Sequence, residues 1–205
     1  MLNKVIEEII SWGKSLFYAV AVSLLITIFL FQPYTVSGSS MEPTLTGLDP
    51  SDESKIGDRV MLYKSAYIFG KNPSYGDIVV IDSHLEKKRT LKDDFFDSPL
   101  IGIVLGNYDE EKKFWIKRVI GQAGDTLEFN DGKVYRNGQE LDEEYIKEDM
   151  VFPFEKVTVP RDHVFVMGDN RNYSKDSREI GTVPVENVVG KVIFRFYPFH
   201  KVDKY

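Results

Sequence analysis

The chain has 205 residues, of which 42% are hydrophobic and 13% aromatic, so it carries enough apolar side chains for a folded core. Acidic residues outnumber basic residues by 32 to 26, and the net charge of -6 disfavours nucleic acid as a partner. The sequence contains no cysteine, which excludes disulfides, thiol catalysis and iron–sulfur ligation, and its three histidines form no helical zinc motif.

The first element in chain order is an uncharged stretch over residues 15–41, apolar almost throughout from Leu16 to Phe31. A helix that rises about 1.5 Å per residue crosses about 30 Å of hydrocarbon if Gln32 to Val36 lie at the far interface. A cleaved secretory signal is the alternative, because Val36-Ser37-Gly38-Ser39 has the small residues of a cleavage site. The apolar region of such a signal is shorter, about 7 to 15 residues. The length therefore predicts one uncleaved N-terminal transmembrane helix.

Basic residues around this stretch predict its orientation. Lys4 and Lys14 precede it, and no lysine or arginine follows until Lys55. Glu7 and Glu8 balance these lysines, but the positive-inside rule counts lysine and arginine alone, so it places the N-terminal side in the cytoplasm. We therefore expect residues 1–36 to form a cytoplasmic tail and single-pass anchor in the cell membrane, and residues 37–205 to form an extracytoplasmic domain.

The rest of the chain consists mainly of short segments typical of β-strands. Runs rich in Val, Ile, Phe and Tyr lie between turn signals at residues 60–63, 77–82, 114–120, 133–136, 163–167 and 188–197. Asp131-Gly132 predicts a tight hairpin across residues 127–135. No sustained 3.6-residue apolar period occurs after the anchor, so we expect a mostly β fold, an antiparallel barrel-like domain behind one transmembrane helix. Residues 85–113 are expected to form a surface excursion with one hairpin.

The segment directly after the anchor, residues 37–45, is rich in serine and small residues. Small residues permit a tight path, and a serine at this place would lie close to the membrane surface, within reach of a membrane-bound substrate. A flexible Ser/Gly-rich linker is the alternative. A nucleophilic serine needs a base, and the sequence has no GxSxG motif to indicate an α/β-hydrolase.

Lys117 lies in the predicted strand 114–120, where alternation places it on the same face as Trp115 and Val119, opposite Arg118. A lysine among apolar neighbours usually extends its ammonium group into water. If the ammonium is instead buried, its pKa falls toward neutrality and the amine becomes a general base. The residues alone leave both interpretations open.

The segment over residues 167–178 combines carboxylate, guanidinium, amide and hydroxyl groups after an apolar run. A solvated turn with an exposed pair between Asp176 and Arg178 is one interpretation. The other is a cross-bonded loop that holds the side chains of a site in place.

Together these segments resemble the successive sequence boxes of the bacterial type I signal peptidase (leader peptidase) family, whose members are serine–lysine dyad peptidases. The resemblance rests on the apolar segment before Ser40 and on four boxes in the family's order: Ser40-Met41-Glu42-Pro43-Thr44-Leu45, residues 75–80, residues 116–121 with Gly124-Asp125, and residues 168–171 through 176–178. The intervening stretches match only in their position between the boxes.

The resemblance implies a membrane-anchored serine endopeptidase that removes signal peptides from exported preproteins, with Ser40 as nucleophile and Lys117 as general base. It implies that Ser174 orients the lysine amine, and that neither a metal nor an organic cofactor takes part. Its partners would be the preproteins and the lipid membrane. It also implies supporting roles for Arg118, Asp169, Asp176 and Arg178, and shallow substrate pockets near Met41, Leu45, Trp115 and Ile116.

Some features depart from the family pattern or leave alternatives open. Some family members carry a hydroxyl residue two positions before the nucleophile, where this chain has Gly38, so the second oxyanion donor stays open. Ser39 is a rival nucleophile by composition alone. A membrane-tethered domain that binds exported chains without cleaving them, and a specialised peptidase with one dedicated substrate, are the alternative functions.

Overall fold

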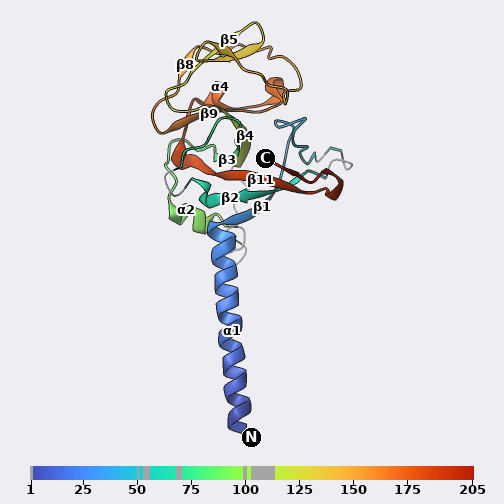
Figure 1. Cartoon of the computed structure of the whole chain (residues 1–205), viewed down its shortest axis with the longest axis vertical. Helices are drawn as coiled ribbons and strands as arrows, with labels where there is room; N and C mark the ends of the chain where they lie inside the picture. The colour runs from blue at the N-terminus through green and yellow to red at the C-terminus, as the bar shows by residue number, and fades with distance from the viewer. Residues whose placement is uncertain (1, 50, 53–55, 68–70, 99–100, 103–113) are drawn as a thin grey trace.

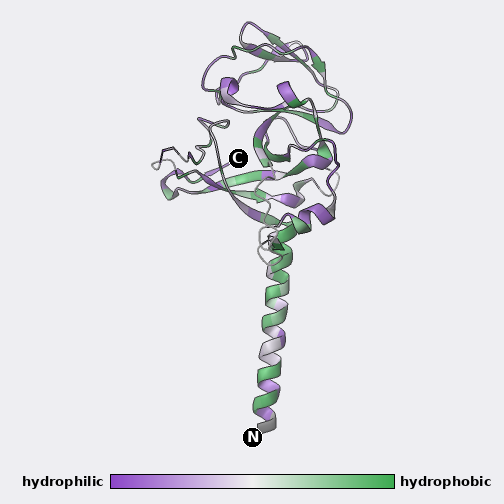
Figure 2. Cartoon of the chain, turned by 180° about the vertical axis from the view of Figure 1, so that it is seen from behind, coloured by the Kyte–Doolittle hydropathy of each residue, from purple (hydrophilic) through white to green (hydrophobic). Residues whose placement is uncertain are grey.

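The computed structural model describes residues 2–49, 51–52, 56–67, 71–98, 101–102 and 114–205, and it places a β domain on top of one long helix (Figure 1). Helix α1 (Leu2–Phe29) is rich in Leu, Ile and Val, contains no proline, and exposes apolar side chains along its length (Figure 2). Within Lys4–Phe29 an apolar window of 18 residues has a mean hydropathy of 1.7 and no buried residue, which is compatible with a membrane span. Ile28, near the end of the helix, is buried.

The end of α1 differs from the prediction. Residues 32–36, which we expected at the far membrane interface, belong to the domain: β1 (Phe31–Thr35) pairs with β2 (Arg59–Tyr63). Proline disfavours the helical conformation in the residue before it, so Pro33 limits the helix. Gln32 and Val36 are buried. The sheet therefore begins two residues after the helix ends.

The predicted strands are confirmed, each within one residue of its expected bounds. Within the described residues an eight-stranded antiparallel sheet has the order β1-β2-β11-β3-β4-β9-β10, with β12 paired to β11. Beyond β1 and β2, its strands are β3 (Ile78–Asp82), β4 (Phe114–Gly121), β9 (His163–Met167), β10 (Val183–Pro184), β11 (Val188–Tyr197) and β12 (Asp203–Lys204). This curled sheet confirms the mostly β, barrel-like architecture.

A smaller sheet lies at the end of the domain opposite α1 (Figure 1). Its strand order is β7 (Gln139–Glu140), β6 (Lys133–Arg136), β5 (Thr126–Asn130) and β8 (Val157–Thr158). The predicted hairpin joins β5 to β6, and both turn residues have positive φ, 47° at Asp131 and 81° at Gly132. Positive φ at both central residues is the geometry of the tight turn that Asp-Gly favours.

The segment after β3 contains helix α2 (Leu91–Phe96), which begins at a capping box formed by Thr90 and Asp93. The hairpin predicted within residues 85–113 is not seen up to residue 98, and residues 99–100 and 103–113 lie outside the described residues. Other short helices are η1 (Lys64–Ala66), η2 (Arg171–Tyr173), α4 (Ser177–Ile180), η3 (Val185–Asn187) and η4 (Phe199–Lys201).

The core is divided by the two faces of β4. Phe114 and Ile116 pack on a cluster that includes Val36, Met41 and Leu45. Trp115 and Val119 pack on the opposite cluster, around β3 and β9. Lys117 follows the same alternation as Trp115 and Val119, as predicted. A further cluster, which contains Ile120, Phe165 and Leu127, joins the large sheet to the smaller one.

Candidate active site

The Ser40 segment follows β1, and its backbone passes so close to itself at Gly47 that only glycine fits there. A Cβ atom on Gly47 would lie 1.8 Å from the carbonyl oxygen of Gly38. The backbone of the segment is held from the other side by Asn170, whose amide N–H donates to the Ser40 carbonyl at 3.0 Å and whose side chain donates to the Ser39 carbonyl at 3.0 Å. Ser40 is half-buried, whereas Ser39 is exposed. These contacts present the hydroxyl of Ser40, not that of Ser39, to the interior.

The Ser40 hydroxyl meets the side chain of Lys117. Lys117 Nζ donates to Ser40 Oγ at 2.8 Å and to the carbonyl oxygen of Ile116 at 3.0 Å. Strand β4 fixes the position of Lys117, because this residue pairs with Val79 of the neighbouring β3. Lys117 is only 3% exposed, and its Nζ lies 5.8 Å from the centre of the Trp115 ring. The structure therefore excludes the interpretation in which the ammonium extends into water.

Burial changes the proton affinity of this amine. Desolvation lowers the pKa of Lys117 from 10.5 to about 8, and Arg178 acts in the same direction. The carboxylates of Asp176 and Asp169 oppose the shift but do not reverse it. A substantial fraction of the amine is therefore neutral in mildly alkaline solution, and a neutral amine 2.8 Å from a hydroxyl is able to accept its proton.

A small cavity adjoins the Ser40–Lys117 pair. Its volume is about 120 Å³, and its lining consists of the end of β1, the Ser40 segment and the first half of β4: Tyr34, Thr35, Val36, Ser37, Ser40, Met41, Val80, Phe114, Trp115, Ile116 and Lys117. Three of the residues that we expected near substrate pockets, Met41, Trp115 and Ile116, line it. Leu45 does not. It is fully buried in the core, because the turn closed by the Leu45 N–H and the Met41 carbonyl directs it inward.

Arg118 ties three parts of the site together from the opposite face of β4. Its guanidinium makes a two-pronged ion pair with Asp169, with distances of 2.8 and 2.7 Å, and donates to the Gly76 carbonyl at 3.1 Å. Asp169 is fully buried and also accepts from the Thr44 hydroxyl at 2.6 Å. This network joins β4, the loop after β9 and the segment that carries Ser40.

Asp176 organises the loop after β9. It is fully buried, accepts from the Gly168 N–H at 3.0 Å, and caps helix α4. Arg178 donates to Asp176 at 2.8 and 2.9 Å and to the Arg171 carbonyl at 2.6 Å. These contacts exclude the solvated-turn interpretation, because an exposed pair would leave Asp176 in water.

Ser174 does not make the contact that we predicted. Its hydroxyl is buried and has no hydrogen-bond partner within the described residues, and Lys117 donates to Ile116 instead. The hydroxyl nevertheless lies within the site. A Cβ atom on Gly168 would lie 2.3 Å from Ser174 Oγ and 2.4 Å from the Ser40 carbonyl. Only a residue without a side chain fits at position 168.

A buried ion pair behind the site was not predicted from the sequence. Arg171 is almost fully buried, makes two contacts of 2.6 Å with Glu143, and donates to the Gly168 carbonyl at 3.1 Å. Tyr145 donates to Glu143 at 2.7 Å, and its ring lies 3.9 Å from the Arg118 guanidinium. Arg171 belongs to a recognisable box, but Glu143 and Tyr145 lie in an acidic stretch typical of a solvated loop. No sequence signal distinguished them.

One amide near the nucleophile is already engaged. The Gly38 N–H donates to the Leu48 carbonyl at 3.2 Å, so it is not directed at the site as an oxyanion donor.

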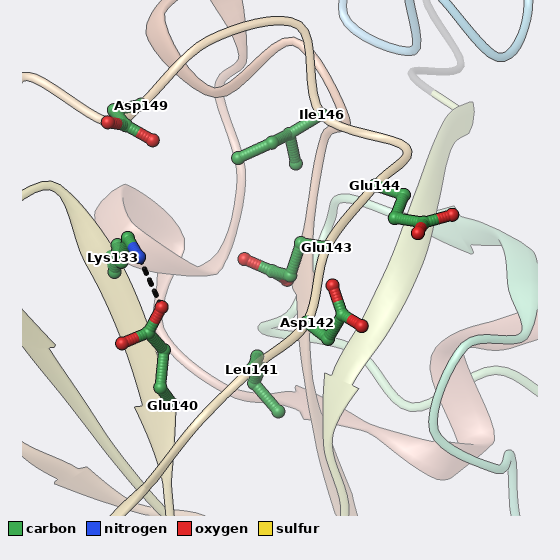
Figure 3. A pocket seen from close by; sticks show the side chains of 8 residues that line it. All are labelled: Lys133, Glu140, Leu141, Asp142, Glu143, Glu144, Ile146 and Asp149. Atoms are coloured by element: carbon green, nitrogen blue, oxygen red, sulfur yellow. Dashed lines mark hydrogen bonds and ion pairs between the residues drawn. The ribbon is translucent and has the colours of Figure 1, made fainter.

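Another cavity, of about 410 Å³, lies beside the hairpin of β6 and β7, with Glu140, Asp142, Glu143, Glu144 and Asp149 around it (Figure 3). Lys133 pairs with Glu140 at its edge. Neither Ser40 nor Lys117 lines it, and no metal-binding cluster of His, Asp or Glu occurs among the described residues.

Comparison with known proteins agrees with this geometry. Residues 9–197 match the family model of signal peptidase, peptidase S26. The chain is 40% identical to the probable signal peptidase I-1 of Synechocystis over 89% of its length and 80% of that protein. It is 33% identical to signal peptidase I of Bacillus licheniformis over 97% of its length and 94% of that protein.

A chloroplast protein of Arabidopsis thaliana, thylakoidal processing peptidase 1, is 35% identical to this chain over 98% of the chain's length. The chain spans about half (52%) of the length of that protein. The family model thus covers nearly the whole chain, and the two bacterial relatives match it over most of their own length. By these matches, the chain belongs to the signal peptidase family, peptidase S26.

Proposed function

We propose that the chain is a membrane-anchored serine endopeptidase that removes signal peptides from exported preproteins, with Ser40 as nucleophile and Lys117 as general base. The observation that carries the proposal is the 2.8 Å contact between Ser40 Oγ and a lysine amine that is 3% exposed. Membership of the signal peptidase family supports the substrate class.

The reaction needs only groups of this chain, the substrate and water. Neutral Lys117 accepts the Ser40 proton as the hydroxyl attacks the substrate carbonyl. The Ser40 backbone N–H stabilises the oxyanion. Lys117 then protonates the leaving amine and, once neutral again, activates the water that hydrolyses the acyl-enzyme. Bound substrate would cover the cavity and complete the exclusion of water from the amine.

The shape of the site supports a preference for small residues before the cleaved bond. A cavity of about 120 Å³ lined by Met41, Val80 and Ile116 accommodates a small apolar side chain. Residues 34–36 of the chain line the same cavity directly after α1. A signal peptide that leaves the same bilayer would therefore reach the cavity with little extended chain.

Arg118, Asp169, Asp176 and Arg178 serve in this proposal as supporting residues that position β4 and the loop after β9. The Ser174 hydroxyl, buried beside Gly168 and the Ser40 carbonyl, would orient the lysine amine after a rotation about its side-chain bond. The catalytic domain would lie on the extracytoplasmic side, since Lys4 and Lys14 precede the apolar part of α1. Protease added to intact spheroplasts should then digest the domain, and full protection would contradict this orientation.

Cleavage of a membrane-inserted preprotein by matched serine variants tests the assignment. Ser40→Ala should lose cleavage by several orders of magnitude, because the members of a catalytic unit act together, while its circular dichroism spectrum stays unchanged. Ser39→Ala is the control, since its hydroxyl is exposed and lies one residue away. If Ser39→Ala loses activity and Ser40→Ala keeps it, the nucleophile has been misassigned. If wild type cleaves nothing, a binding function without catalysis is the better account.

A further inference from the structure

A second buried ion pair lies next to the segment that carries Ser40. Asp58 directly precedes β2, and Arg195 lies in β11, the strand that pairs with β2. Arg195 Nη1 donates to Asp58 Oδ2 at 2.9 Å, and the two side chains are only 11% and 3% exposed. Burial of two charges is costly unless further hydrogen bonds satisfy them, so this pair needs additional partners.

The additional partners are backbone groups of the turn that follows Ser40. Arg195 Nη1 also donates to the Thr44 carbonyl at 2.9 Å. Asp58 Oδ2 accepts from the Thr46 N–H at 2.9 Å, and the Asp58 N–H donates to the Thr46 carbonyl at 2.8 Å. The ion pair therefore fixes the backbone at two positions shortly after Ser40.

The turn transmits this support to the nucleophile. The Leu45 N–H donates to the Met41 carbonyl at 2.9 Å, and both side chains are buried in one core cluster. Such a cluster is closely packed, so the turn cannot deform gradually around a shifted residue. Because Met41 directly follows Ser40, a displacement of Thr44 moves the turn and with it the Ser40 hydroxyl.

The chain after β11 closes over Arg195. Arg195 Nε donates to the Lys201 carbonyl at 2.6 Å. Strand β12 pairs with β11, the Tyr205 N–H donates to the Ile193 carbonyl at 3.1 Å, and the Tyr205 ring centre lies 6.0 Å from the guanidinium. The end of the chain thus lies beside β11 (Figure 1). With Nε bound to one segment and Nη1 to another, the planar guanidinium has a fixed orientation.

Thr44 is shared by this pair and by the pair of Arg118 and Asp169. The Thr44 hydroxyl donates to Asp169 at 2.6 Å, whereas its carbonyl accepts from Arg195 at 2.9 Å. Neither Asp58 nor Arg195 lines the cavity beside Ser40. Any effect of this pair on the reaction is therefore exerted through the position of the turn.

We propose that Asp58 and Arg195 are positioning residues, which hold the turn so that Ser40 Oγ stays 2.8 Å from Lys117 Nζ. This inference rests on the proposed function, since it concerns the reaction of Ser40. Misplacement of a reacting group by about 1 Å costs roughly 100-fold in rate, so a loosened turn should lower kcat by roughly tenfold or more.

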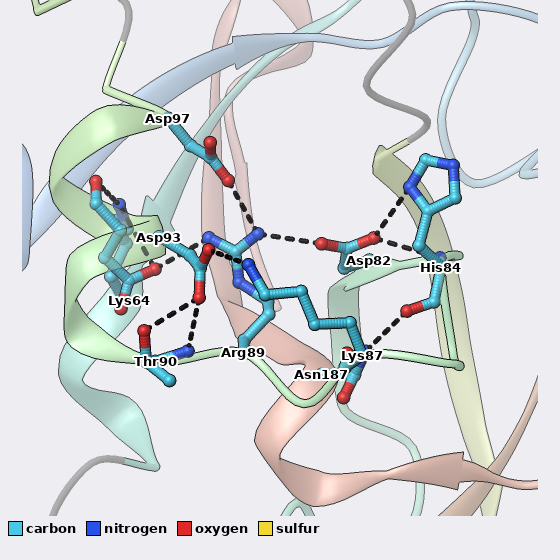
Figure 4. Close-up of polar contacts among 10 residues, drawn as sticks. Lys64, Asp82, His84, Lys87, Arg89, Thr90, Asp93, Asp97 and Asn187 are labelled. Atoms are coloured by element: carbon cyan, nitrogen blue, oxygen red, sulfur yellow. Dashed lines mark hydrogen bonds and ion pairs between the residues drawn. The ribbon is translucent and has the colours of Figure 1, made fainter.

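Another buried arginine provides a matched control. Arg89 is 5% exposed and donates to Asp82 of β3 at 2.9 Å and to Asp97, at the end of α2, at 2.8 Å (Figure 4). This cluster joins β3 to α2, which lies beside the end of α1 (Figure 1). Asp97→Asn removes a carboxylate charge from a buried arginine, as Asp58→Asn does, but its arginine does not bind the turn after Ser40.

Cleavage of one preprotein in detergent micelles compares full-length wild type, Ser40→Ala, Asp58→Asn and Asp97→Asn. Each kcat is divided by the folded fraction measured by circular dichroism. Asp58→Asn should lower kcat by roughly tenfold or more and change KM by less than about threefold, because the turn positions Ser40. Asp97→Asn should keep kcat within about twofold of wild type, since it acts on stability alone.

A wild-type kcat for folded Asp58→Asn would overturn the proposal. An equal loss of kcat in Asp97→Asn would also overturn it, because both ion pairs would then act through general stability. If Asp58→Asn does not fold, Arg195→Lys decides. The lysine keeps a charge beside Asp58, but its single nitrogen cannot reproduce the guanidinium contacts, so kcat should fall by roughly threefold or more. An unchanged kcat in that variant would refute the positioning role.

The same assay separates this inference from the proposed function. If wild type cleaves nothing, or if Ser40→Ala cleaves as fast as wild type, the proposed function fails and this inference fails with it. If wild type cleaves, Ser40→Ala does not, and Asp58→Asn matches wild type, the positioning role alone is wrong.

Discussion

Replacement of Lys117 by methionine should stabilise the fold while it abolishes catalysis. Methionine has a similar unbranched shape and no charge, so the substitution removes the cost of burying an ammonium group without leaving a large void. The cost is set by two values, the pKa of about 8 in the folded chain and the ordinary value of 10.5. At about 1.4 kcal/mol per pKa unit the difference corresponds to about 3 kcal/mol.

The sign of the pH dependence follows from proton binding. Below pH 8 both states bind the proton, so the folded wild type bears the full cost. Between pH 8 and 10.5 the unfolded chain holds a proton that the folded chain has released, so wild-type stability rises with pH. The stability of the Lys117→Met variant has no such pH dependence. Its stability advantage over wild type should therefore shrink by about 3 kcal/mol across this window.

The absolute gain at neutral pH should be smaller, since methionine leaves the Ile116 carbonyl and the Ser40 hydroxyl without their partner, at about 1 kcal/mol each. Thermal unfolding of the full chain in detergent micelles, at a series of pH values, measures the difference. A change of about 3 kcal/mol corresponds to roughly 6–12 °C in Tm for a domain of this size. Lys201→Met, at an exposed lysine, is the control. A constant Tm difference between Lys117→Met and wild type across the window would refute the buried-amine argument.

Three further predictions concern the same site. Cleavage should rise with pH with a midpoint near 8, and Lys117→Arg should be inactive because a guanidinium keeps its proton; a rate that is flat from pH 6 to 10 would exclude this amine as the base. Gly168→Ala should lower kcat by roughly tenfold or more, since the added Cβ collides with the Ser40 carbonyl, whereas Gly13→Ala, with open space around it, should match wild type. Glu143→Gln should destabilise the chain by about 3–5 kcal/mol in urea unfolding, because it leaves the Arg171 charge buried without a partner; an unchanged midpoint would show that the pair is not needed for stability.

Local sequence patterns predicted the elements of this fold well where their cause is local. Runs of β-branched and aromatic residues identified the main strands, and Asp131-Gly132 identified a turn that requires positive φ at both positions. The two-residue period of β4 also predicted which neighbours share a face with Lys117. These features depend on steric preferences and alternation within a few residues, so they are visible without the rest of the chain.

The environment of each site residue was decided by tertiary packing. Lys117 and Ser40 are 77 positions apart, and tertiary contacts, among them the pairing of β4 with β3 and the Asn170 contacts to the Ser40 segment, bring them within 2.8 Å. Whether the Lys117 ammonium reaches water depends on the segments that cover it, and the sequence of β4 does not determine which segments these are. Leu45 was expected near the substrate and lies in the core for the same reason.

The C-terminal end of α1 and the partner of the buried Arg171 were likewise decided by tertiary structure. Apolar composition predicted a membrane helix, but pairing with β2 drew residues 31–35 into the sheet. Glu143 lies in an acidic stretch that resembles a solvated loop, yet its carboxylate is buried against Arg171, 28 positions away. Composition and periodicity describe how a segment behaves on its own. Desolvation and charge pairing depend on which distant segments meet, and the folded chain alone determines that.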